Sequence, residues 1–238
     1  MRESIYQNRR QFLQVASTAG AAGILSGFHA AGAEAAPKQA EGQEEISPNE
    51  DLMREHGVLN RVLLVYEESV RRLAAKSPDL KPEILSSAAD IIRRFIEEYH
   101  EKLEEDYLFT RFEKAGKQMP LVRVLRQQHE VGRRVTQQIL ALATLPALRD
   151  AADRQRLSDA IQRFIRMYRP HESREDTILF PAFRGLVSGH EFDALSEEFE
   201  KKEQQLFGED GFEKMVDKVA DLEKALGIYD LSQFTPKE

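Results

Sequence analysis

Residues 171–180 read H-E-S-R-E-D-T-I-L-F, and the predicted fold is built around this segment. His171 and Glu175 stand four residues apart, so on a helix their side chains lie on one face, one turn apart. A second segment of the same kind, H-E-K-L-E-E-D-Y-L-F, occupies residues 100–109, with His100 and Glu104 at the same spacing. Each of two helices is therefore expected to offer one imidazole and one carboxylate on the same face.

Apolar residues recur at spacings of three and four in four long segments, which is the pattern of amphipathic helices. The first helix is predicted to begin at Ser47-Pro48, because serine caps a helix and proline fits its first position. Breaks are expected at residues 77–82, at Gly116 and at Leu145-Pro146, and Ile178 is expected on the buried stripe of the fourth helix. We therefore predict an all-α protein in which residues 48–187 form an up-down-up-down four-helix bundle.

Two further histidines, His56 and His129, fall on the apolar stripes of the first and third helices. Taken alone, a histidine on such a stripe is more often a satisfied core residue than a ligand. Here, however, four histidines lie on the stripes of four helices, and two of them have a carboxylate at helical spacing. No lysine or arginine lies on these stripes, and a buried carboxylate without a cation is costly. We therefore predict a metal centre, for which imidazole and carboxylate ligands without sulfur fit iron, manganese or zinc.

The order of a lone histidine, an HxxxE, a lone histidine and a second HxxxE resembles the haemerythrin-like (HHE cation-binding) family, over about residues 49–187. The resemblance implies two non-haem iron ions joined by an oxo or hydroxo bridge. It also implies bridging glutamates at Glu104 and Glu175, with terminal ligands at His56, His100, His129 and His171. Glu101 matches a further carboxylate ligand in the H-E-x-x-E members of the family, and Glu172 holds the equivalent place in the fourth helix.

The chain departs from the O2-carrying haemerythrins, which have a histidine pair and an aspartate that are absent here. A carboxylate, a tyrosine or water must fill the missing position, and more oxygen ligands stabilise the ferric state. We therefore expect reversible oxygen carriage to be disfavoured. Tyr99, Tyr107 and Tyr168 are expected in the core or behind the ligands, with a ligating tyrosine as the alternative. His190 lies outside the four stripes and is expected at the surface.

The function that the resemblance implies is binding of iron and of a small diatomic ligand, O2 or NO, for sensing, scavenging or stress protection. Two alternatives stay open: a di-iron enzyme that reduces peroxide or oxidises iron, and a metal-storage bundle without turnover. The sequence contains no phosphate-binding loop and no Gly-rich dinucleotide turn that would favour another reaction.

The amino-acid composition excludes several kinds of metal site, cofactor and partner. The 238 residues include no cysteine, which excludes disulfides, thiolate metal sites, iron–sulfur clusters and covalently attached c-type haem in this chain. The net charge is −7 and no basic stripe with aromatic residues is present, so nucleic acid is not expected as a partner. Residues 188–238 carry two more amphipathic patterns, predicted as a helical extension that covers the bundle or forms a contact in a homo-oligomer.

The N-terminus resembles an export signal. Residues 8–14 read N-R-R-Q-F-L-Q, which is similar to the twin-arginine export motif, and a weakly apolar run rich in Ala and Gly follows over residues 15–28. The run is too short and too polar for a membrane span, and A-x-A cleavage patterns occur at residues 31–33 and 33–35. We predict a signal peptide over residues 1–36, a linker over residues 37–47, and a periplasmic protein without a membrane span, delivered by the twin-arginine machinery. The alternative is a disordered tail.

Replacing both Arg9 and Arg10 by Lys tests this export signal. We expect the variant to stay in the cytoplasm with its leader intact, because the export machinery reads the arginine pair. Cell fractionation and immunoblotting distinguish the two forms by location and size. A processed periplasmic form of the variant in wild-type amount would refute the twin-arginine route.

Overall fold

The computed structural model describes residues 46–77 and 79–236, and these residues form helices and connecting turns with no strand among them. The fold is therefore all-α, as predicted. The proposed signal peptide and nearly all of the proposed linker lie outside the described residues.

The first two helical stretches begin and end where the sequence predicts. Helix α1 (Pro48–Ala74) starts after Ser47, whose hydroxyl accepts a hydrogen bond from the Glu50 amide at 3.3 Å. The second stretch ends at Gly116, which has φ 64°, a conformation that favours glycine at a helix C-terminus. It runs without a break through five elements: α2 (Pro82–Ile91), η2 (Ile92–His100), α3 (Glu101–Leu103), η3 (Glu104–Phe109) and α4 (Thr110–Ala115).

The remaining helices follow the predicted breaks. Helix α5 (Met119–Leu142) is followed by the short α6 (Leu145–Arg149), at the predicted Leu145-Pro146 break. The fourth stretch continues through Pro170 and consists of α7 (Ala151–Arg174), η4 (Glu175–Leu179) and α8 (Phe180–Arg184). The C-terminal part consists of α9 (Gly189–Phe207), α10 (Gly211–Leu226) and the short 3-10 helix η5 (Leu231–Phe234).

Three of these elements, η2, η3 and η4, are π-helical, with turns wider than those of an α-helix. Amphipathic periodicity does not predict them, and the expected position of one residue is wrong as a result. Ile178, expected on the buried stripe of the fourth helix, is 39% exposed, while Leu179 is fully buried. In η4, whose turn is wider than the 3.6 residues of an α-helix, the next buried side chain after Glu175 is four residues on, at Leu179, rather than three residues on, at Ile178.

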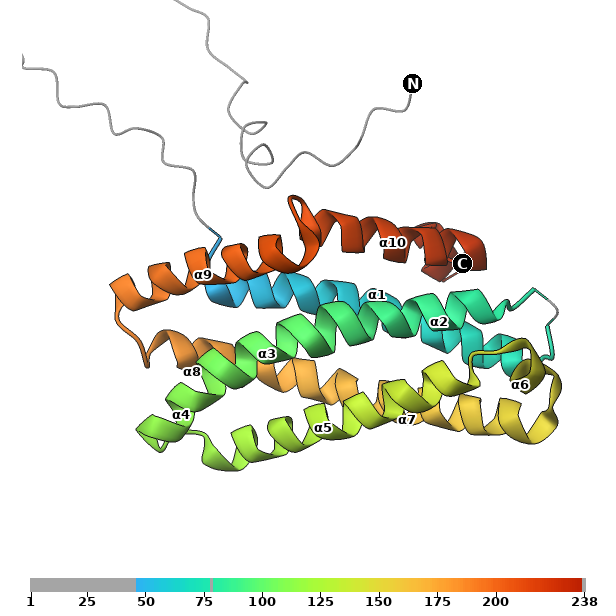
Figure 1. The fold of residues 1–238 in the computed structure, drawn as a ribbon, viewed down its shortest axis with the longest axis horizontal. Coiled ribbons are helices and arrows are strands. Elements are labelled where there is room, and N and C mark those ends of the chain that lie inside the picture. Colours follow the sequence, from blue (N-terminus) through green and yellow to red (C-terminus); the bar gives the residue numbers. More distant parts are fainter. Residues whose placement is uncertain (1–45, 78, 237–238) are drawn as a thin grey trace, which may run out of the picture. The chain divides into compact units, whose positions relative to one another are not determined.

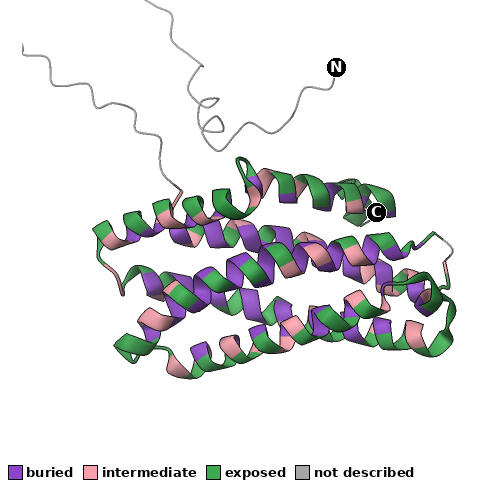
Figure 2. Ribbon diagram, in the orientation of Figure 1, coloured by how far each residue is buried: buried purple, intermediate pink, exposed green. Residues whose placement is uncertain are grey.

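The long helices lie side by side (Figure 1). Helix α7 packs against both α1 and α5, and the second stretch packs against α1 and α5 through α2 and η2. Helices α9 and α10 cover α1 and the second stretch. Buried positions lie on the faces that the helices turn toward one another, and exposed positions face outward (Figure 2).

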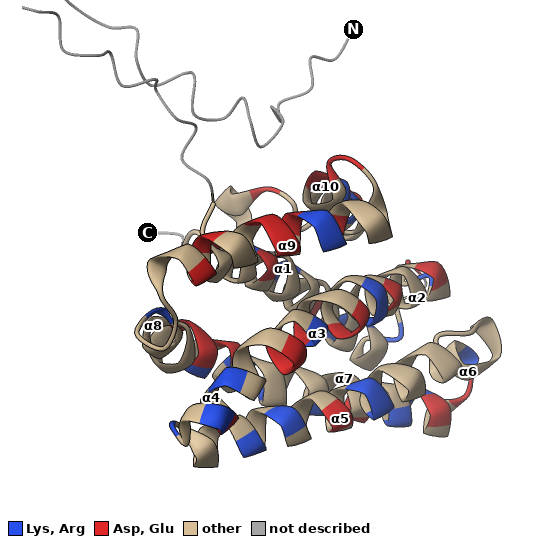
Figure 3. Cartoon of the chain, turned by 60° about the vertical axis from the view of Figure 1, so that its left-hand side comes forward, with Lys and Arg blue, Asp and Glu red and all other residues tan. Residues whose placement is uncertain are grey.

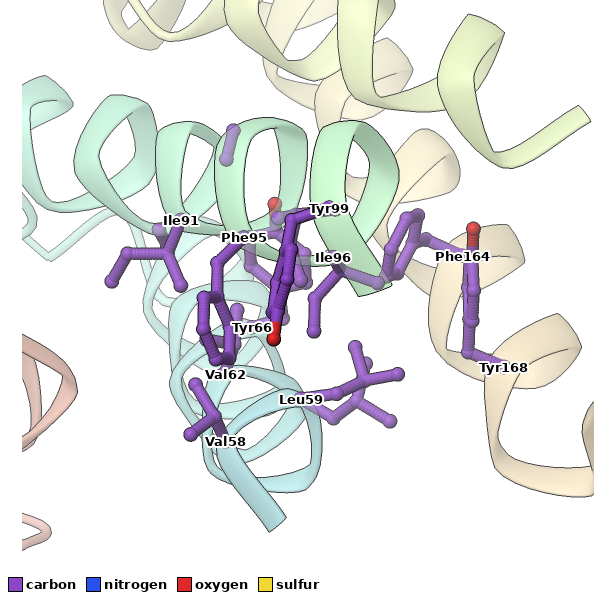
Figure 4. Close-up of a cluster of buried hydrophobic side chains, with 14 of the residues drawn as sticks. Val58, Leu59, Val62, Tyr66, Ile91, Phe95, Ile96, Tyr99, Phe164 and Tyr168 are labelled. Atoms are coloured by element: carbon purple, nitrogen blue, oxygen red, sulfur yellow. The ribbon is translucent and has the colours of Figure 1, made fainter. Parts of the chain in front are cut away.

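Aromatic and aliphatic side chains from three stretches fill the interior beside the candidate ligands. Val58, Leu59, Val62 and Tyr66 of α1 lie opposite Ile91, Phe95, Ile96 and Tyr99, while Phe164 and Tyr168 come from α7 (Figure 4). The rings of Tyr66 and Phe164 meet edge to face at 5.7 Å, and those of Phe164 and Tyr168 stack at 4.3 Å.

The outer faces are polar. Both signs of charge occur on these faces, but α5 carries mainly basic residues and α9 mainly acidic ones (Figure 3). In the described part of the chain, no helix combines the length and the apolar character that crossing a membrane requires.

Gly132 of α5 marks a close approach between α5 and α7. A Cβ atom at this position would overlap the Tyr168 hydroxyl and lie 2.8 Å from Cζ of the same ring. We expect Gly132→Ala to lower the free energy of unfolding by about 1–3 kcal/mol, because the tyrosine or the helix must move. Thermal unfolding followed by circular dichroism measures the change.

Gly57→Ala is the matched control, since Gly57 lies on α1 and no neighbouring atom is within 4 Å of the place that a Cβ would take. In an open helical position alanine stabilises by roughly 0.5–1 kcal/mol relative to glycine. Equal effects of the two substitutions would contradict the close packing of Tyr168 on Gly132.

Candidate metal centre

The four predicted histidines come together in the interior, one from each long helical stretch. All four residues are at most 4% exposed: His56, His100, His129 and His171. They form two pairs, in which the Nε2 atoms of His56 and His100 lie 3.1 Å apart and those of His129 and His171 lie 3.2 Å apart. Every histidine thus turns Nε2 toward the same interior space.

Glu104 and Glu175 lie between these two pairs. Oε2 of Glu104 is 3.7 Å from Nε2 of His100 and 3.4 Å from Nε2 of His129. Oε2 of Glu175 is 3.4 Å from Nε2 of His56 and 3.1 Å from Nε2 of His171. Each carboxylate therefore reaches one histidine of each pair, which is the placement that a bridging ligand needs.

The two carboxylates lack other partners. Both glutamates are fully buried, and none of their four oxygens has a hydrogen-bond partner within the described part of the chain. Arg133 lies one turn beyond His129 on α5, but its guanidinium pairs with Glu101 and Glu105 instead. Because buried carboxylates without partners are costly, a cation held among the imidazoles fits this donor set.

Nδ1, the ring nitrogen of each histidine that points away from the centre, also has a hydrogen-bond partner. Nδ1 of His56 lies 2.8 Å from Asp176, and Nδ1 of His100 lies 2.7 Å from Glu55. Nδ1 of His129 lies 3.1 Å from Glu105, and Nδ1 of His171 lies 2.9 Å from Gln128. An Nδ1–H donated outward leaves the Nε2 lone pair free to face the centre, which is the usual arrangement of metal-ligating histidines.

Sequence reasoning missed these four acceptors, although their positions follow a simple rule. Glu55 and Gln128 immediately precede the lone histidines, and Glu105 and Asp176 immediately follow the HxxxE glutamates. Residues 100–109 and 171–180 both end in Leu-Phe, and the two phenylalanines follow the same symmetry. Phe180 stacks on His56 at 5.5 Å, and Phe109 stacks on His129 at 5.4 Å.

Glu101 and Glu172, the predicted further carboxylates, lie next to the centre and are hydrogen-bonded. Glu101 accepts a hydrogen bond from the Tyr168 hydroxyl at 2.7 Å and pairs with Arg133 at 2.7 Å. Its carboxylate also lies close to Glu105 and His129. Glu172 accepts a hydrogen bond from the Asn60 amide at 2.7 Å.

The other aromatic and histidine candidates are placed as follows. The Tyr107 hydroxyl donates to Glu198 at 3.1 Å, on the side of α9. The buried Tyr99 ring packs on Phe95 and Phe207. His190 is exposed near the start of α9 and takes no part in the cluster.

The protonation of the cluster reflects strong coupling between its members. Burial acts to lower the pKa of His56, but the adjacent carboxylates of Asp176 and Glu175 raise this pKa to about 10. Burial and the neighbouring His56 hold the pKa of His100 well below its usual range. Burial and the charge of Glu175 raise the pKa of Glu104 well above normal. The raised pKa values of His56 and Glu104 favour their protonated forms, so a metal ion bound to these two groups would displace protons.

A family model described as the hemerythrin HHE cation binding domain matches residues 47–153 and 137–234. An uncharacterized protein of Mycobacterium tuberculosis and one of Mycobacterium bovis are each 47% identical over 236 residues. These alignments cover 96% of this chain and 91% of each relative. No solved structure matches the chain.

Alanine variants separate the proposed ligands from their neighbours. After anaerobic loading with ferrous iron, we expect two ions per chain in the wild type. His171→Ala removes one nitrogen and should lose one ion or most of both, while Glu175→Ala removes a bridge and should disrupt both positions. Elemental analysis measures the iron content. Loss of buried ligands also lowers the melting temperature of the loaded protein.

His190→Ala is the control and should keep full metal content, since His190 lies outside the cluster. If His190→Ala depleted iron while His56→Ala did not, the assignment of the histidines would be wrong.

Proposed function

The chain belongs to the hemerythrin HHE cation-binding domain family, and from this premise we propose that it is a non-haem di-iron protein that binds a small diatomic ligand, O2 or NO. The observation that supports this most directly is that two buried carboxylates face the four Nε2 atoms and have no hydrogen-bond partner among the described residues. Mixed nitrogen and oxygen donors with two shared glutamates suit a pair of iron ions, with manganese or zinc as other candidates.

The helices supply the arrangement that such a centre needs. We assign α1, the stretch 82–115, α5 and the stretch 151–184 to the four helices of an up-down-up-down bundle. The contacts of α7 with α1 and α5, and of the second stretch with α1 and α5, support this assignment. One histidine comes from each stretch, so the centre lies where all four meet.

A ferrous pair, when bound, supplies the electrons with which O2 or NO is held. The protein supplies position and environment. The outward Nδ1 contacts fix the ring orientation of each histidine, and Glu104 and Glu175 connect the two pairs. Phe109 and Phe180, both fully buried, cover two of the rings and exclude water from that side.

One observation favours an enzyme as the second candidate. The centre has four histidines, and the buried carboxylate of Glu101 lies beside it, held by Tyr168 and Arg133. A centre rich in oxygen donors favours the ferric state, which suits reduction of peroxide or oxidation of iron better than reversible ligand binding.

We also propose that the protein works in the periplasm, after export by the twin-arginine machinery. This proposal depends on residues 8–14 and on the A-x-A patterns that follow them. The twin-arginine route carries folded proteins, so a centre loaded in the cytoplasm would survive export.

Stopped-flow mixing of the diferrous protein with O2 distinguishes these functions. For a ligand-binding protein, we expect an absorption change that one equivalent of O2 saturates and that argon reverses. An enzyme would instead consume O2 or peroxide over many cycles. No spectral change would contradict both functions and indicate a metal store, and loading of one ion or fewer per chain would contradict the di-iron centre.

A further inference from the structure

The two histidine pairs are alike in geometry but differ in their charged surroundings. We define the first half of the centre by His56 and His100, and the second half by His129 and His171. In both halves the Nε2 atoms lie 3.1–3.2 Å apart, and each Nδ1 has an acceptor within 3.1 Å. Any difference between the halves therefore comes from the chemistry of the acceptors and their neighbours.

Both Nδ1 acceptors of the first half, Asp176 and Glu55, are carboxylates. Glu55 is fully buried and also lies in a cluster with Asp51 and Glu203, in which one oxygen of each lies within 4.8 Å of the others.

The second half is largely neutralised. Its one carboxylate acceptor, Glu105, also binds Lys102 at 2.5 Å and Arg133 at 2.6 Å. The acceptor of His171 is Gln128, a neutral amide. Gln128 stands in the chain where Glu55 stands in the first half, immediately before the lone histidine.

The positions four residues after the lone histidines differ in the same sense. Arg133 follows His129 and pairs with Glu101, while the neutral Asn60 follows His56 and binds Glu172. The Arg133 guanidinium therefore offsets carboxylate charge beside the second half, whereas the first half has an amide at the matching position.

Both differences act in one direction on a metal ion. A carboxylate that accepts from Nδ1–H makes the imidazole a stronger ligand than a neutral amide does, and outer partners of this kind change metal affinity about 10–100-fold. We propose that the two metal positions are unequal, that the His56–His100 half takes the first divalent ion, and that Glu55 and Gln128 set this order. The inference rests on the proposed di-metal function and adds an order of filling to it.

Titration of the full chain with Zn2+ tests the order. Selective 15N labelling of histidine allows the ring nitrogens to be followed by NMR, with assignments from single His→Ala variants. We expect the first equivalent of Zn2+ to shift the resonances of His56 and His100, and the second to shift those of His129 and His171. A competing chelator gives the two dissociation constants.

Exchange of the two acceptors provides the decisive variants. Glu55→Gln and Gln128→Glu keep side-chain size, and each should reduce the difference between the two affinities by about 10-fold. The double exchange should equalise the halves or reverse their order. Glu198→Gln, a carboxylate-to-amide change beside Tyr107 on α9, is the control and should leave the order unchanged. Thermal unfolding of the metal-free variants shows whether each is folded. Gln128 is only half-buried, so Gln128→Glu tests the inference even if Glu55→Gln destabilises the protein.

The outcomes separate this inference from the function on which it rests. Simultaneous shifts of all four histidines, earlier filling of the His129–His171 half, or an order unaffected by the exchange would overturn the inference and leave the metal centre intact. No shift of any of the four histidines would overturn the proposed metal centre itself.

Discussion

The burial of Glu104 and Glu175, to which no group in residues 46–77 or 79–236 donates a hydrogen bond, is the constraint on which the rest of the structure depends. An uncompensated carboxylate in a protein interior costs several kcal/mol, and a cation held by the imidazoles would offset that cost. The imidazoles that would hold the cation come from four different stretches. Metal binding therefore depends on the packing of all four stretches against one another. Binding free energy of the metal becomes folding free energy wherever the unfolded chain lacks a preformed site.

The outer hydrogen bonds connect the stretches in a particular pattern. The acceptor of His100 lies on α1 and that of His56 on η4, while the acceptor of His129 lies on η3 and that of His171 on α5. Each ring is thus positioned by a helix other than its own. Displacement of one helix would misorient a histidine on its neighbour, so the geometry of the centre is determined by all four stretches together rather than by local motifs.

Local rules explain what the sequence could predict. Capping at Ser47, termination at Gly116 and the four histidine stripes depend on residues close together in the chain, so they could be predicted without a structure. The Nδ1 acceptors depend on pairing between distant helices, and periodicity alone does not show which neighbour a side chain reaches. The expectation for Ile178 is wrong because it assumes α-helical turns throughout, whereas η4 is π-helical. For Glu101, the family resemblance predicts a metal ligand, whereas the contacts with Tyr168 and Arg133 depend on distant helices and could not be predicted.

The π-helical turns affect how this chain tolerates changes of length. In an α-helix, one inserted residue rotates everything beyond it by about 100°, which would carry a downstream core face into solvent. A π turn takes up the additional residue within itself. Since η3 begins at Glu104 and η4 at Glu175, these wide turns also set the places of the acceptors Glu105 and Asp176 that follow the two glutamates. One residue lost within either turn would restore α-helical winding but would move that acceptor away from the histidine that it orients.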